Sequence, residues 1–120
     1  MRIRLAAFLA VFSSGCTATA APPAVTASPL ASAERGLSFA QERCASCHGV
    51  VPNTVSPNPE SPPFEDIANR NGLTVETLGQ FLVDSHNFPV AMDFTVTRTQ
   101  ARDLATWMLT MRKAGHQPQH

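Results

Sequence analysis

The chain of 120 residues is short enough to form one domain with a modest core. Nine basic side chains balance nine acidic ones, and Lys113 is the only lysine. This composition excludes the broad basic surface of a nucleic-acid-binding protein, and it disfavours a docking face ringed by lysines.

The first 20 residues have the pattern of an export signal. Arg2 and Arg4 form a positive start, and the apolar run of residues 5–12 is too short to span a membrane. The small residues 18–20 (Ala-Thr-Ala) form a cleavage site, so we expect a signal peptide over residues 1–20. In an alternative, the sequence before Cys16 resembles a lipoprotein signal, and Cys16 would then carry a lipid anchor.

Residues 21–31 are rich in Ala, Pro, Ser and Thr and have little to bury, which predicts a flexible lead-in. The folded domain is expected over residues 32–114, and its first helix over Ser32–Cys47. Gly36 lies inside this helix, where glycine costs about 1 kcal/mol relative to alanine. A close contact with another helix would explain this glycine.

Cys44, Cys47 and His48 form a CxxCH motif, in which one turn can present both sulfurs to the vinyl groups of a haem and the imidazole to its iron. A structural zinc site would need four ligands, but no cysteine follows and only three other histidines remain. A redox disulfide pair would sit in a βαβ unit, and residues 30–60 show no period-two alternation. The motif therefore predicts one covalently bound haem c.

With this motif the chain resembles the class I cytochrome c family. In that family a glycine and an aromatic residue on the preceding helix allow the C-terminal helix to cross at short range, and Gly36 and Phe39 match these positions. The resemblance covers about residues 33–113. It implies a small all-α fold of about four helices wrapped around the haem.

The stretch from residue 50 to 63 is expected to be irregular, because proline removes backbone donors and breaks helices and strands. Its prolines are Pro52, Pro57, Pro59, Pro62 and Pro63. In the family, a proline carbonyl soon after the motif accepts a hydrogen bond from the ligand histidine and tunes it. The resemblance makes Pro52 the candidate, with Pro57 behind it, although each could also be a surface loop residue.

Two short helices are predicted next. The first runs over residues 63–69 with a proline at its permitted first turn, and residues 71–72 (Asn-Gly) stop it. The second opens at Thr74 as N-cap. Its apolar stripe consists of Val75, Leu78, Phe81 and Leu82.

The following loop contains His86 and Met92. A methionine opposite the histidine raises the haem potential into the range of an electron carrier. The family places its axial methionine on this loop, so the resemblance makes Met92 the sixth ligand. His86 is the alternative ligand, or else a loop histidine near a haem propionate or solvent.

The last helix is expected after Thr97, which forms a capping box with Gln100, and it should end at Gly115. Its apolar face consists of Ala101, Leu104, Ala105, Trp107, Met108 and Met111. The resemblance places Trp107 against the N-terminal helix, and both methionines are more simply core residues than ligands. Residues 115–120 read as a polar tail in which His116 and His120 have no expected role.

These features predict a monohaem cytochrome c, exported to a bacterial periplasm, that shuttles single electrons between larger redox proteins. We expect an electron-transfer protein rather than an enzyme, because no acid–base pair, nucleophile or phosphate loop can be assembled from its residues. A membrane is expected as a partner only through a lipid at Cys16. The alternative function is a haem-based ligand-binding or sensing module with a weak or absent sixth ligand.

Overall fold

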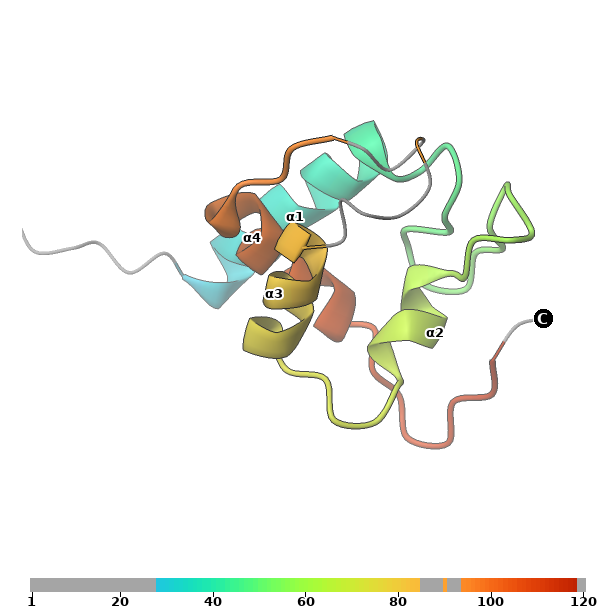
Figure 1. The fold of residues 1–120 in the computed structure, drawn as a ribbon. Coiled ribbons are helices and arrows are strands. Elements are labelled where there is room, and N and C mark those ends of the chain that lie inside the picture. The colour runs from blue at the N-terminus through green and yellow to red at the C-terminus, as the bar shows by residue number, and fades with distance from the viewer. Residues whose placement is uncertain (1–27, 85–89, 91–93, 119–120) are drawn as a thin grey trace, which may run out of the picture.

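The computed structural model describes residues 28–84, 90 and 94–118 (Figure 1). It contains the helices α1 (Pro29–Arg43), α2 (Phe64–Ala68), α3 (Val75–Asp84) and α4 (Arg98–Leu109). These residues include no strand, so the prediction of an all-α chain of about four helices is confirmed. The predicted signal peptide, His86, Met92 and His120 lie outside the described residues.

Helix α1 begins at Pro29, three residues before the predicted start at Ser32. Proline is tolerated here because the first turn of a helix has no internal partner for a backbone N–H. The helix ends at Arg43, and Cys44 to His48 continue as a turn rather than as helix. Residues 29–31, expected in the lead-in, are therefore helical.

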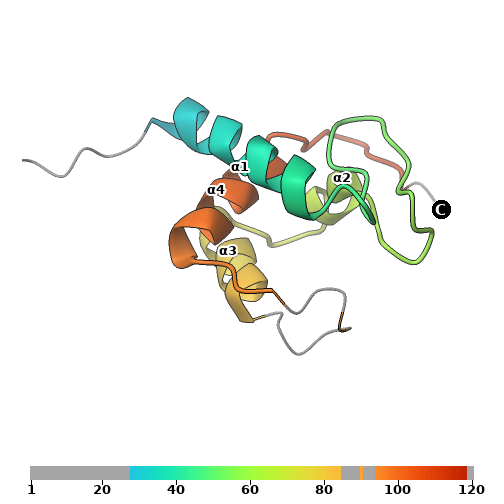
Figure 2. The ribbon, with the colours of Figure 1, turned by 90° about the horizontal axis from the view of Figure 1, so that it is seen from above.

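Helices α1 and α4 cross at very short range, and α4 lies between α1 and α3 (Figures 1 and 2). A Cβ atom at Gly36 would lie 2.1 Å from the backbone oxygen of Asp103 and 2.9 Å from Cβ of Trp107. Only glycine fits there, so the expected close helix contact is confirmed. Arg35, beside the glycine, donates to both carboxylate oxygens of Asp103, over 2.7 Å from Nε and 2.9 Å from Nη2.

The core lies where α2, α3 and α4 meet the end of α1. Met108 and Met111 are 1% and 2% exposed, which confirms them as core residues. Phe81 of α3, in contrast, is 54% exposed although it belongs to the predicted apolar stripe. The buried cluster consists of Ala40, Val50, Phe64, Ala68, Leu78, Leu104, Ala105, Met108 and Met111.

The predicted helix starts of α3 and α4 are confirmed by their caps. Oγ1 of Thr97 accepts from the backbone N–H of Gln100, and the Gln100 side chain accepts from the backbone N–H of Thr97. Oγ1 of Thr74 likewise accepts from the backbone N–H of Thr77 over 3.1 Å. Such caps satisfy donors that the first helical turn leaves open. None of the described helices is long and apolar enough to cross a membrane.

Trp107→Ala is expected to lower the free energy of unfolding of the holo-protein by about 3 kcal/mol, the lower end for truncation of a core aromatic. The ring is only partly buried, but its Nε1 donates to the backbone oxygen of Val50 over 2.9 Å. Trp107→Phe keeps most of the packing and should lose only about 1 kcal/mol with that hydrogen bond. Denaturant melts measure both, and a loss under about 1 kcal/mol for Trp107→Ala would contradict this docking of α4.

Candidate functional site

The CxxCH motif forms a tight turn directly after α1. The backbone N–H groups of Cys47 and His48 both donate to the carbonyl oxygen of Cys44, over 3.1 Å and 2.9 Å. Both thiols are free and partly buried. Burial, together with the neighbouring Cys47 thiol, raises the pKa of Cys44 to about 11, so its thiol is protonated at neutral pH.

The ring of His48 is held by a backbone carbonyl from the end of the proline-rich loop. Nδ1 of His48 lies 2.8 Å from the carbonyl oxygen of Pro62. A carbonyl can only accept, so Nδ1 must carry the hydrogen and Nε2 keeps its lone pair. This tautomer leaves Nε2 as the nitrogen that can bind a metal ion.

The prediction that Pro52, or Pro57 behind it, would supply this carbonyl is wrong. Both prolines are exposed, and the acceptor is Pro62. The loop folds back onto the motif, because the backbone N–H of Asn58 donates to Cys47 and that of Phe64 donates to Gly49. The end of the loop, rather than its start, therefore lies beside the ring.

Phe64, the first residue of α2, supports the same ring from another side. Its side chain is 4% exposed, and its ring centroid lies 5.4 Å from that of His48 at an interplanar angle of 46°. Such tilted pairs of rings are favourable packing arrangements. His48 is thus fixed by one hydrogen bond and one aromatic contact, both from the segment that begins α2.

A buried ionic cluster lies on α2, directly after Phe64. The side chain of Glu65 is 4% exposed and lies 2.5 Å from Nζ of Lys113, and it also accepts from the backbone N–H of Asn53 over 2.8 Å. The hydrogen bond from Lys113, followed by that from Asn53, lowers the pKa of Glu65. The carboxylate is therefore kept charged within the fold.

His116 belongs to this cluster, so the expectation that it has no specific contact is wrong. Its side chain is 9% exposed, and its Nε2 lies 2.6 Å from Oδ1 of Asp66. Gly115 has a φ of 71°, which is the left-handed conformation, and this residue directly precedes His116. Helix α4 ends at Leu109 rather than at Gly115 as expected, and the left-handed Gly115 instead lies in the turn that brings His116 back onto the domain.

The stability of the protein should fall in acid because of Glu65. A group whose pKa is lowered by folding stabilises the fold above its ordinary pKa, here 4.5, and this contribution is lost as the pH falls through the folded-state value. Denaturant unfolding at a series of pH values should therefore show a smaller acid-side loss in Glu65→Gln than in the wild type. Glu60→Gln, the same change at an exposed position, is the control and should keep the wild-type slope.

The side chains of the CxxCH turn fit a haem held by two thioether bonds and one axial histidine. Cys44 and Cys47 are free thiols on one turn, and His48 has its outer nitrogen available. The described residues contain no group of three or more His, Cys, Asp or Glu side chains placed to hold a metal ion. Met92 and His86 are not among them, so the sixth ligand stays a prediction.

Comparison with known proteins gives one informative match. No family model and no solved structure matches the chain significantly. Cytochrome c-552 of Bradyrhizobium diazoefficiens is 31% identical to it over 97 residues, which cover 81% of this chain and 91% of that protein. The match thus extends over nearly the whole of that protein. From this similarity, the chain belongs to the family of c-type cytochromes.

Proposed function

We propose that this chain is a periplasmic electron carrier that holds one haem c. The observation that carries the proposal is the hydrogen bond between Nδ1 of His48 and Pro62 within the CxxCH turn. The Pro62 carbonyl accepts a hydrogen bond from Nδ1 of His48, and this fixes the tautomer in which Nε2 can bind iron. The similarity to a cytochrome c-552 over most of the chain supports the same cofactor.

Each residue of the turn has a separate role in this proposal. Cys44 and Cys47 form the two thioether bonds that keep the porphyrin in the fold. His48 binds iron through Nε2, and the Pro62 carbonyl fixes its ring and raises its basicity. The haem itself supplies a one-electron change at iron.

Met92 is proposed as the sixth ligand. A thioether is a soft, weak donor that favours ferrous iron, whereas the imidazole of His48 made more basic by Pro62 favours ferric iron. The balance of the two sets a potential suited to electron transfer. Met92 lies outside the described residues, so this role rests on the sequence.

The proposed partners are larger redox proteins that give and take single electrons, and the proposed location is the periplasm. Export is supported by the signal pattern of residues 1–20, with a lipid at Cys16 as the alternative form. The protein acts as a carrier rather than as an enzyme.

The visible spectrum of the ferric holo-protein tests this function. Methionine ligation gives a weak absorption band in the near red, which five-coordinate and bis-histidine haems lack. We expect that band, and no rapid binding of carbon monoxide to the ferrous protein. A five-coordinate spectrum with rapid carbon monoxide binding would instead assign the chain to ligand binding or sensing.

A further inference from the structure

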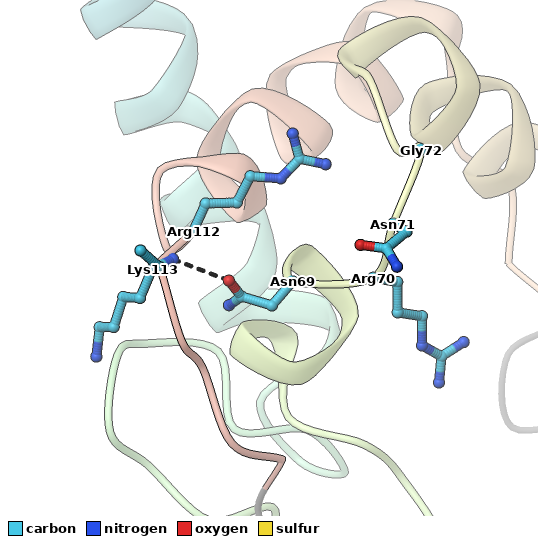
Figure 3. A pocket seen from close by; sticks show the side chains of 7 residues that line it. Asn69, Arg70, Asn71, Gly72, Arg112 and Lys113 are labelled. Carbon is cyan, nitrogen blue, oxygen red and sulfur yellow. Dashed lines mark hydrogen bonds between the residues drawn. The ribbon is translucent and has the colours of Figure 1, made fainter.

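Residues 111–116, called here the C-terminal strap, run beside α2 and are joined to it by Asn69 (Figure 3). Oδ1 of Asn69 accepts from the backbone N–H of Lys113 over 2.8 Å. Its Nδ2 donates to the backbone oxygens of Glu65 and Met111, over 2.8 Å and 3.2 Å. One amide thus connects the end of α2 with the beginning of the strap.

Three side chains of the strap also hold α2. Arg112 donates from Nε to the backbone oxygen of Ala68 over 2.9 Å, and Nζ of Lys113 pairs with the buried carboxylate of Glu65. Farther along, His116 bonds to the carboxylate of Asp66. A helix of five residues is not stable alone, so the position of α2 depends on contacts of this kind.

Helix α2 in turn positions the carbonyl that holds His48. Pro62 and Pro63 have no N–H and cannot be fixed by backbone donors of their own. The carbonyl oxygen of Pro63 accepts from the backbone N–H groups of Asp66 and Ile67, over 3.1 Å and 3.2 Å, which ties these prolines to the first turn of α2. A hydrogen bond of 2.8 Å weakens steeply with misalignment, so a small shift of α2 would loosen the bond from His48 to Pro62.

We propose that the C-terminal strap, through Lys113 and Asn69, holds α2 so that the Pro62 carbonyl stays on Nδ1 of His48 and thereby lowers the reduction potential of the iron. Lys113 and Asn69 are positioning residues in this proposal, since neither touches His48. The proposal rests on the proposed function, because it requires His48 to be the iron ligand.

The direction in which Lys113→Met shifts the reduction potential distinguishes this proposal from a direct charge effect. Without Lys113, the buried carboxylate of Glu65 loses its nearest cation. Helix α2 is then expected to shift so that water can reach this carboxylate. The bond from His48 to Pro62 then loosens, the imidazole becomes less basic, and the potential rises. A direct charge effect has the opposite sign, because losing a positive charge stabilises ferric iron and lowers the potential.

Asn69→Ala is the second variant, and it changes no charge. It removes the two hydrogen bonds that join Asn69 to the strap and a third to the backbone oxygen of Glu65 within α2, and it should also raise the potential. It keeps the proposal testable if Lys113→Met gives no folded holo-protein. Adding Glu65→Gln to Lys113→Met removes the uncompensated charge and should bring the potential back toward the wild type. Arg70→Met, at an exposed position near Asn69 (Figure 3), is the control for charge.

Two measurements on the holo-proteins report the result. Redox titration gives the midpoint potential, and proton NMR of the ferrous form gives the exchange rate of the Nδ1 hydrogen of His48. We expect a higher potential and faster exchange in Lys113→Met and Asn69→Ala, and neither change in Arg70→Met. Faster exchange is the direct sign of a loosened bond to Pro62, which a charge effect alone would not produce.

The outcomes separate this proposal from the proposed function. Unchanged exchange in both variants, a lower potential in Lys113→Met, or an equal rise in Arg70→Met would each overturn the role of the strap. In all of these cases the wild type would still carry a haem with His48 as ligand. A wild type without covalent haem, or without His48 on the iron, would overturn the proposed function itself.

Discussion

Cys44→Ala combined with Cys47→Ala is expected to abolish covalent haem attachment completely. A c-type haem is held by thioether bonds from two cysteines, and Cys44 and Cys47 are the only cysteines among the described residues. Cys16 lies within the predicted signal, 28 positions before Cys44, and cannot replace either thiol. A denaturing gel stained for haem peroxidase activity, beside an immunoblot of the same chain, measures the result.

Ser46→Ala is the matched control for this experiment. Ser46 lies between the two thiols in the same turn, and its side chain is exposed. Its replacement by alanine leaves both sulfurs in place and removes only the weak hydrogen bond of 3.8 Å from the Ser46 hydroxyl to the Cys47 sulfur. We expect full staining in Ser46→Ala and none in the double variant. A stained band from the double variant would show that the haem is attached elsewhere or not through cysteine.

The features that could be predicted from the sequence are those set by local spacing. The CxxCH residues are consecutive, so they had to share one turn wherever the chain placed it. The cap of Thr97 with Gln100 depends on residues three apart and was found as predicted. Gly36 was also informative, because a glycine inside a helix is unfavourable unless a neighbouring backbone needs its space, which Asp103 does.

The features that could not be predicted depend on the path of the chain through space. Five prolines lie between residues 50 and 63, soon after the motif, and each has a carbonyl that could face His48. The carbonyl of Pro62 lies beside His48 because of hydrogen bonds between residues far apart, such as that from Phe64 to Gly49. No local sequence pattern predicts such a bond. The buried position of His116 likewise follows from tertiary contacts with Asp66, 50 residues earlier.

The two wrong predictions, for Pro62 and for His116, concern the same part of the molecule. Pro62 lies two residues before the start of α2, and His116 bonds to α2 from the C-terminal strap. The proline-rich loop and the C-terminal tail were expected to be separate polar regions, because neither has apolar periodicity. Their joint role comes from polar contacts around a buried Glu65, and such contacts leave little trace in a hydrophobic pattern.

Met92→His is expected to lower the midpoint potential strongly while leaving haem attachment intact. Histidine is a harder and stronger donor than a thioether, and it stabilises ferric iron relative to ferrous iron. Axial ligands shift haem potentials over a range of about 0.8 V, so this exchange should move the potential by a considerable part of that range. Redox titration of the purified variant against the wild type measures the shift.

The controls for this prediction are the two buried methionines of the C-terminal region. Met108→Leu and Met111→Leu conserve core volume at positions that are 1% and 2% exposed, and such exchanges usually cost under about 1.5 kcal/mol. Neither side chain is expected to touch iron, so both variants should keep the wild-type potential and the near-red absorption band. An unchanged potential in Met92→His, or a large fall in either leucine variant, would mean that Met92 is not the methionine on the iron.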